Sequence, residues 1–220
     1  MNSVHIKTQH QFSAIGLLSV GVVFVCAAII TLFISKTTPL LVGILFLLGG
    51  TTICLSIAAI YNPKISMTLT DMHLQQHTNK GGWAVKWKNI ADINHVYLTN
   101  LTDSLPWVGI KLHHYDAFLD AICPRMASKI IVEQRILLVM AFKYQPVDKY
   151  QLEDILFDDT PYITETGKRY TGLLAVLANR MTYQRELLGF DVYISAEELD
   201  RPIPDFIGLA RRFLAAAERN

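Results

Sequence analysis

The sequence predicts an α+β protein in which an N-terminal helical hairpin precedes one water-soluble domain. All 19 acidic residues lie between Asp71 and Glu218, so the first 70 residues carry no negative charge. Within those residues, two long segments, 12–34 and 39–61, contain no charged side chain at all. Beyond residue 61 the pattern changes to short alternating stretches typical of strands, and the chain ends in an amphipathic helical pattern.

The two uncharged segments are each long enough to cross a membrane. At ~1.5 Å per residue, each extends about 34 Å as a helix, against a hydrocarbon core of ~30 Å. Two such segments in tandem would be unusual as buried core helices of a small soluble domain. The first is also longer than the ~7–15 apolar residues of a cleaved signal peptide. We therefore expect a transmembrane hairpin, turned by residues 35–38, whose partner is the lipid bilayer.

Small residues predict how the two helices pack. Gly43, Gly50, Cys54 and Ala58 lie near one face of the second segment. Because small side chains let helices approach closely in lipid, we expect this face to contact the first helix.

Charge also predicts the orientation of the hairpin. Lys7 precedes it, Lys64 and Lys80 follow it, and Lys36 alone lies in its loop. Since basic residues gather on the cytoplasmic side, we expect both ends of the hairpin, and the domain, in the cytoplasm. Cys26, Cys54 and Cys123 give no disulfide framework, which fits a reducing compartment.

Residues 62–220 form the predicted soluble domain, with 1–61 as tail and anchor, and we expect 62–220 to fold alone. Two of the 20 basic residues precede residue 62, which leaves 18 against 19 acidic ones. Nucleic-acid-binding domains usually carry a clear basic excess, so no nucleic-acid partner is expected.

Alternation and turn residues predict the elements of this domain in order. The expected strands are 65–70, 73–78, 83–87, 89–98, 108–113, the continuous apolar run 136–142 and 190–194. The expected helices are 116–122, 125–131, a helical insertion at about 168–188 and a final helix from Pro204, with a capped turn at 195–198 and a partly irregular acidic stretch at 151–166.

The final helix carries a regular apolar stripe. Phe206, Leu209, Phe213 and Leu214 recur at three- and four-residue spacing, so they form its predicted buried face. The neighbouring arginines, 211 and 212, are expected at the margin of that face or in solvent.

Two stretches carry a family resemblance. Ile65–Asp71 and Gly82–Ile90, the latter reading Gly-Trp-Ala-Val-Lys-Trp-Lys-Asn-Ile, resemble the opening strands of bacterial pleckstrin-homology-like (PH-like) domains. The whole chain is similar to an uncharacterised family of bacterial inner-membrane proteins with two transmembrane helices before such a domain. The resemblance covers the anchor and about 40 soluble residues, and is loose over 106–190. It implies a bent antiparallel barrel or sandwich capped by the final helix, and it supplies no catalytic residues.

Several polar groups are candidates for metal or catalytic sites. His113 and His114 are neighbours on a predicted strand and point to opposite faces, so with Asp116 and Asp120 they make a poor metal site. The acidic residues Glu153, Asp154, Asp158 and Asp159 lack the glycine of a calcium loop and are expected to be solvated. Cys123, beside Arg125, has no adjacent histidine and is expected to be structural. No catalytic residue, cofactor or metal is assigned.

Aromatic and basic side chains suggest two further roles. Trp83 and Trp87 have strand spacing and are expected in the core, although with Trp107 they would also suit a ligand platform. Lys80, Lys86 and Lys88 follow the anchor closely, so they are candidates for contact with anionic lipid headgroups.

These observations favour a non-enzymatic, membrane-anchored interaction or scaffold protein that meets a protein partner or a second copy. The first alternative is a module that binds or senses anionic headgroups, and the second is a membrane-bound enzyme with an unrecognised site. Transport is disfavoured because the two helices contain no charged residue to mark a pathway.

Overall fold

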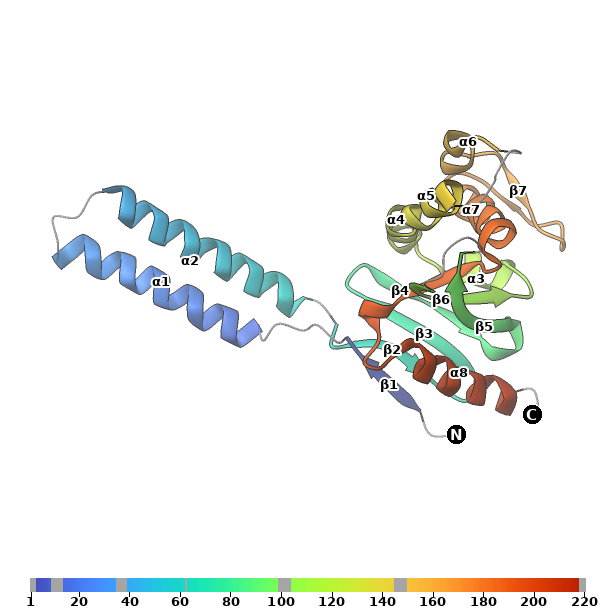
Figure 1. The fold of residues 1–220 in the computed structure, drawn as a ribbon, viewed down its shortest axis with the longest axis horizontal. Helices are drawn as coiled ribbons and strands as arrows, with labels where there is room; N and C mark the ends of the chain where they lie inside the picture. The colour runs from blue at the N-terminus through green and yellow to red at the C-terminus, as the bar shows by residue number, and fades with distance from the viewer. Residues whose placement is uncertain are drawn as a thin grey trace. The chain divides into compact units, whose positions relative to one another are not determined.

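The computed structural model describes residues 3–8, 14–34, 39–61, 63–98, 104–144 and 150–217. The chain divides into two compact units. One comprises His10–Lys64, and the other joins Met1–Gln9 to Ile65–Asn220 (Figure 1). The predicted start of the first apolar segment at residue 12, and the predicted loop 35–38 with Lys36, lie outside the described residues.

The first unit consists of two apolar helices, α1 (Ala14–Ile34) and α2 (Pro39–Ile60). Ser56 Oγ donates to the carbonyl of Ala14 at 2.6 Å, while Gly21 and Gly49 lie against each other further along, so the helices run antiparallel. Stretches of 20 and 22 residues in them are long and apolar enough to span a membrane. Their outward faces are lined by exposed Leu, Ile, Val and Phe side chains.

The small residues at the contact between the two helices are not the ones that the sequence predicted. A Cβ added at Gly21 would lie 2.7 Å from Ile53 Cγ1, and one added at Gly49 would lie 2.7 Å from Val25 Cγ2. The predicted face, which contains Gly43, Gly50, Cys54 and Ala58, is exposed instead. The prediction was wrong because α2 has two faces with small residues, and only the small residues of α1 decide which of them can approach closely.

Two antiparallel sheets form the framework of the second unit. The strands are β1 (Val4–Lys7), β2 (Ile65–Leu69), β3 (His73–Thr78) and β4 (Gly81–Lys86) in the first sheet, β5 (Ile90–Tyr97), β6 (Ser104–Leu112) and β9 (Val192–Ser195) in the second, and the short pair β7 (Tyr162–Ile163) and β8 (Arg169–Tyr170). The spatial orders are β1-β2-β3-β4, β5-β6-β9 and β7-β8, and the described strands do not close into one barrel.

Strand β1 comes from the residues before the hairpin. The sequence pattern predicted that these residues belong with the anchor. Val4 pairs with Leu69 and Ile6 with Met67, and the Ile6 side chain is fully buried in the core. The hairpin is therefore inserted between two neighbouring strands of one sheet. Four residues are the shortest run in which alternation indicates a strand, and no local pattern shows that Val4–Lys7 pairs with a strand beyond the hairpin.

The tryptophans Trp83 and Trp87 lie in the core, as predicted. Trp87 begins the short 3-10 helix η1 (Trp87–Asn89), donates from Nε1 to the Thr70 carbonyl at 2.8 Å, and stacks on Phe213 with ring centroids 5.7 Å apart. Trp83 packs edge-on against Phe118. Both rings are fully or almost fully buried, so neither is available as a ligand platform.

The final helix, α8 (Ile203–Ala217), packs by the predicted face. Phe206, Leu209 and Phe213 are buried and Leu214 is partly buried. Arg212 is exposed, while Arg211 Nε donates to the Ile93 carbonyl at 3.0 Å at the edge of the contact with β5.

A largely helical region separates β6 from β9 and is longer than the insertion predicted at about 168–188; we call this whole region the helical insertion. Its helices are α3 (Asp116–Ala121), α4 (Pro124–Glu133), α5 (Arg135–Tyr144), α6 (Leu152–Leu156) and α7 (Leu173–Leu188). The predicted buried strand 136–142 is wrong, because these residues form α5. Leu137, Leu138 and Ala141 are buried at helical spacing while Ile136 is exposed, and a short apolar run does not distinguish the two structures.

The helix predicted from residue 168 begins five residues later. Arg169 and Tyr170 pair with β7, and Gly172 then has a φ of +61°, a left-handed conformation that interrupts the chain before α7. At its other end α7 stops at Gly189, with φ +86°, which is the predicted C-cap.

Candidate functional site

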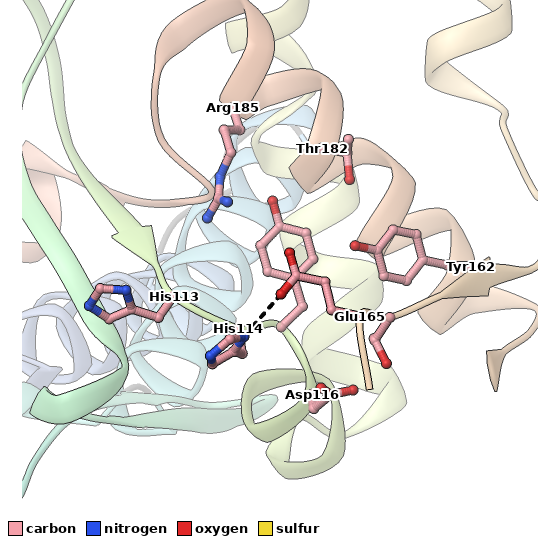
Figure 2. Close-up of a pocket in the computed structure, with 9 residues that line it drawn as sticks. His113, His114, Asp116, Tyr162, Glu165, Thr182 and Arg185 are labelled. Atoms are coloured by element: carbon pink, nitrogen blue, oxygen red, sulfur yellow. Dashed lines mark ion pairs between the residues drawn. The ribbon is translucent and has the colours of Figure 1, made fainter. Parts of the chain in front are cut away.

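Among the described residues of the α+β unit, two surface hollows are lined by polar and charged side chains. The first, which we call the β6 hollow, opens beyond the end of β6 and has a volume of about 140 Å³. Figure 2 shows His113 and His114 on one side and Tyr162, Thr182 and Arg185 on the other. His114 Nδ1 lies 3.5 Å from Glu165 Oε2, and both side chains are largely exposed.

Tyr115 and Arg185, which line the β6 hollow, belong to a paired ionic network. Asp191, which is fully buried, accepts hydrogen bonds from Tyr115 Oη at 2.6 Å, Arg185 Nε at 2.6 Å and the Leu112 amide at 2.7 Å. Arg185 also lies over the Tyr115 ring, 5.0 Å from its centroid. This network joins the end of β6 to α7 and to the start of β9.

Burial sets the protonation of this network. Burial, followed by the adjacent Asp191 charge, raises the pKa of Tyr115 far above its usual value, so the phenol stays protonated and donates. Burial opposes the charge of Arg185, but the hydrogen bonds to Asp191 outweigh it and raise its pKa. Because these central groups already pair their hydrogen-bonding atoms and charges with one another, the network is best explained as structural.

The second hollow, which we call the α4 cleft, lies between α4 and the ends of β3, β6 and β9, and its volume is about 470 Å³. This size falls within the usual range of small-ligand sites. Its wall includes the 3-10 helix η2 (Ala196–Glu198), which is capped by Ser195 as the sequence predicted. The lining residues are Gln76, Pro106, Trp107, Met126, Lys129, Ile130, Glu133, Gln134, Tyr193, Ser195, Glu197 and Glu198.

Charged groups meet in the α4 cleft at short range. Lys129 Nζ lies 3.6 Å from Glu133 Oε2 and 3.8 Å from Glu198 Oε1. Gln76 Nε2 donates to the other oxygen of Glu198 at 2.7 Å. Burial raises the pKa of Glu198 above its usual value, and the nearby Lys129 charge opposes this shift.

One buried acceptor on the wall of the α4 cleft has no partner. The Gln134 side chain is buried, and its Nε2 donates to the Tyr193 carbonyl at 3.1 Å. Its Oε1 accepts no hydrogen bond from any described residue. Buried polar atoms are normally paired, so this atom distinguishes the α4 cleft from the β6 hollow and makes the cleft the candidate functional site.

The sequence did not predict the α4 cleft, although two features that form it can be recognised in the sequence. Trp107 lines it half-buried, as the one tryptophan outside the core. The capped turn Ser195–Glu198 supplies two of the carboxylates that line it, those of Glu197 and Glu198. The rest of the wall comes from α4 and from strands distant in the chain.

The three candidate headgroup lysines are exposed but lie at two separate ends of the first sheet. Lys80 is in the turn between β3 and β4, beside the pair Thr78 and Gly81. Lys86, at the other end of β4, pairs with His73, and Lys88 follows in η1. A strand of six residues separates them by about 20 Å at ~3.3 Å per residue, so they do not converge on one headgroup.

The other polar candidates are held in structural contacts. His113, His114 and Asp116 line the β6 hollow, whereas Asp120 pairs with Lys168 and accepts from Tyr170 Oη at 2.9 Å. In the described part of the chain, no three His, Cys, Asp or Glu side chains are placed to hold a metal ion.

The acidic stretch is solvated except at one position. Glu153, Asp154 and Asp159 are exposed, while Asp158 accepts from Tyr183 Oη at 2.7 Å and from the Thr160 amide. Cys123 is half-buried, and its Sγ lies 3.6 Å from the Lys80 carbonyl, which places it against the β3–β4 turn.

Comparison with known proteins identifies a family for most of the α+β unit. A family model described as a protein of unknown function (DUF2982) matches residues 67–216. No curated protein and no solved structure matches the chain. Because the matched region covers more than half of the sequence, the chain belongs to the DUF2982 family.

Proposed function

We propose that this protein is a membrane-anchored interaction protein. In this proposal α1 and α2 cross the lipid bilayer, and the α+β unit binds a protein partner, or a second copy, at the cytoplasmic face of a bacterial inner membrane. The pairing of β1 with β2 carries the proposal. The chain leaves the sheet after Lys7 and returns at Ile65, and these two residues are partners in the sheet. Both connections to the anchor therefore leave from one end of the first sheet.

We further propose that the α+β unit is a PH-like domain. Two antiparallel sheets with α8 packed by its apolar face support this assignment, as does the placement of Trp83 and Trp87 in the core. The helical insertion between β6 and β9 accounts for the weak resemblance over residues 106–190. In this view the insertion also supplies the binding surface, since α4 forms one side of the α4 cleft.

Contact with anionic lipid headgroups is the second candidate, favoured by a specific arrangement of lysines. Lys7 and Lys80 are exposed, and the sheet register puts Lys7 and the β3–β4 turn that contains Lys80 at the end of the first sheet from which both connections leave. Each would contribute ~1 kcal/mol near an anionic surface. Lys86 and Lys88 lie at the opposite end, so they support this candidate less than Lys80 does.

Anchoring is tested by extraction and by labelling. Full-length protein should stay in the membrane fraction after alkaline carbonate treatment, and its release into the soluble fraction would contradict the proposal. A cysteine introduced in place of Thr37, with the native cysteines replaced by serine, should react with an impermeant reagent added outside intact cells. Reaction at the C-terminus instead would reverse the orientation.

Partner binding is tested by site-specific photo-crosslinking in living cells. A photoreactive residue in place of Pro106, at the exposed edge of the α4 cleft, should give a discrete crosslinked band that mass spectrometry identifies. The matched control is the exposed Glu153 of α6. The same products from both positions would contradict a specific interface. Salt separates the two candidates, because lysine–headgroup contacts weaken steeply with ionic strength whereas a packed protein interface does not.

A further inference from the structure

We propose that the α4 cleft receives a basic side chain, lysine or arginine, from a protein partner. This inference rests on the proposed function and names the chemistry of the partner. Three independent features of the cleft support it: its charge, its unpaired acceptor and its apolar walls.

The charged residues of the cleft leave an excess of negative charge. Glu133, Glu197 and Glu198 line it, and Lys129 is the single cation among the lining residues. Lys129 already lies within 4 Å of two of these carboxylates, so its charge is shared between them. A ligand with positive charge is therefore favoured over a neutral or an acidic one.

The unpaired acceptor requires a hydrogen-bond donor. Gln134 is 4% exposed, and its Nε2 is already committed to the Tyr193 carbonyl, which leaves Oε1 as the free end of the amide. Lysine ammonium and arginine guanidinium groups carry only donors, so either is chemically suited to an amide oxygen and to carboxylates as acceptors. Charge-assisted hydrogen bonds of this kind are stronger than neutral ones.

The apolar walls favour a cation on an aliphatic stem over a bare ion. Pro106, Trp107, Met126 and Ile130 line the same cleft. The methylene groups of lysine and arginine cover apolar surface while their charged ends stay in a polar environment. An indole ring such as that of Trp107 also attracts an ammonium or guanidinium group. The volume of about 470 Å³ accommodates a whole side chain.

The test uses full-length protein in detergent with methyl groups of Met126 and Ile130 as NMR reporters. Three capped tripeptides serve as probes: acetyl-Ala-Arg-Ala-amide, its Gln counterpart and its Glu counterpart. Agmatine, a free guanidinium compound, represents a small-molecule source of the same chemistry. We expect saturable shifts of both methyl signals with the Arg peptide and none with the Gln or Glu peptides.

Matched variants assign the effect to the cleft. Glu133→Gln together with Glu197→Gln should weaken binding of the Arg peptide about tenfold, because two exposed carboxylates lose their charge while the half-buried Glu198 is kept. Glu153→Gln, an exposed carboxylate on α6, should leave it unchanged. Melting temperatures equal to that of the wild type establish that both variants remain folded.

Each other result overturns the inference. Equal shifts with the Gln peptide would show that the cleft recognises shape and not charge. No shift at millimolar Arg peptide would show that the cleft does not bind a basic side chain. Tighter binding of agmatine than of the peptide would identify a small free cation as the occupant. A partner crosslinked in cells without any effect of the Glu133 and Glu197 changes would overturn this inference and leave the proposed function standing. Release of the protein by carbonate would overturn the proposed function itself.

Discussion

The burial of Ile6 predicts that the stability of the α+β unit depends on a residue that precedes the helical hairpin in the chain. Ile6 is fully buried and lies in the same core cluster as Met67 and Leu69 of β2. Its neighbour His5 is exposed, and its Nδ1 lies 3.1 Å from Thr68 Oγ1 at the surface. Ile6→Ala and His5→Ala therefore form a matched pair on one strand.

The expected difference follows from the cost of a core cavity. Truncation of a buried isoleucine to alanine costs ~2–5 kcal/mol, out of a total stability of ~5–15 kcal/mol for a domain. For a domain of this size each kcal/mol lowers the melting temperature by ~2–4 °C, so Ile6→Ala should lower it by about 4–20 °C. His5→Ala should change it by less than about 2 °C, because surface substitutions stay within ~0.5 kcal/mol.

Tryptophan fluorescence of the full-length protein in detergent measures this difference. All 3 tryptophans lie in the α+β unit, so the signal does not report melting of the hairpin. Equal melting of the two variants would refute the packing of β1.

A second experiment replaces the hairpin. Because Lys7 pairs with Ile65, a short glycine-containing turn from residue 8 to residue 64 would join the two strands directly. That soluble protein should melt well above the fragment 62–220, which lacks β1. Identical melting would show that the fragment folds without the strand, as the sequence alone suggested.

The remaining predictions concern α8, the β6 hollow and the α4 cleft. Phe213→Ala should cost ~3–5 kcal/mol through lost stacking on Trp87, and Arg212→Ala should have almost no effect on the melting temperature. Asp191→Asn should cost ~3–5 kcal/mol in denaturant unfolding, because it leaves the Arg185 charge without its partner; a loss below ~1 kcal/mol would mean that water replaces the pair. Since burial raises the pKa of Glu198 above 4.5, its contribution to stability is complete below pH 4.5 and declines as the pH rises through its folded-state pKa. Glu198→Gln does not titrate, so its stability relative to wild type should increase with pH over that range, and a constant difference would contradict the shift.

Local patterns predicted much of the fold. The uncharged segments predicted α1 and α2, and alternation predicted β2, β3 and the inward side chains of β4. The apolar stripe of α8 correctly predicted which of its residues are buried and that Arg212 is exposed. These features depend on periodicity within one element, where the side chains that share a face follow from backbone geometry alone.

The errors share a different physical origin. The run 136–142 is apolar in a way that suits both a buried strand and a helix, and packing beside α7 and α6 decided for the helix. The small residues of α2 lie on two faces, and Gly21 of α1 selected one of them. In each case the deciding contact lies on another element.

The sequence by itself determined that two apolar helices precede an α+β domain, because charge distribution and periodicity are properties of short stretches. Only the tertiary structure decided that β1 belongs to that domain, that Asp191 joins Tyr115 to Arg185, and that the carboxylates of η2 meet Lys129 and Gln134 in the α4 cleft. These residues are far apart in the chain, and no local pattern specifies which distant partners meet. Their proximity results from burying the apolar faces of both sheets and the helical insertion in a shared core.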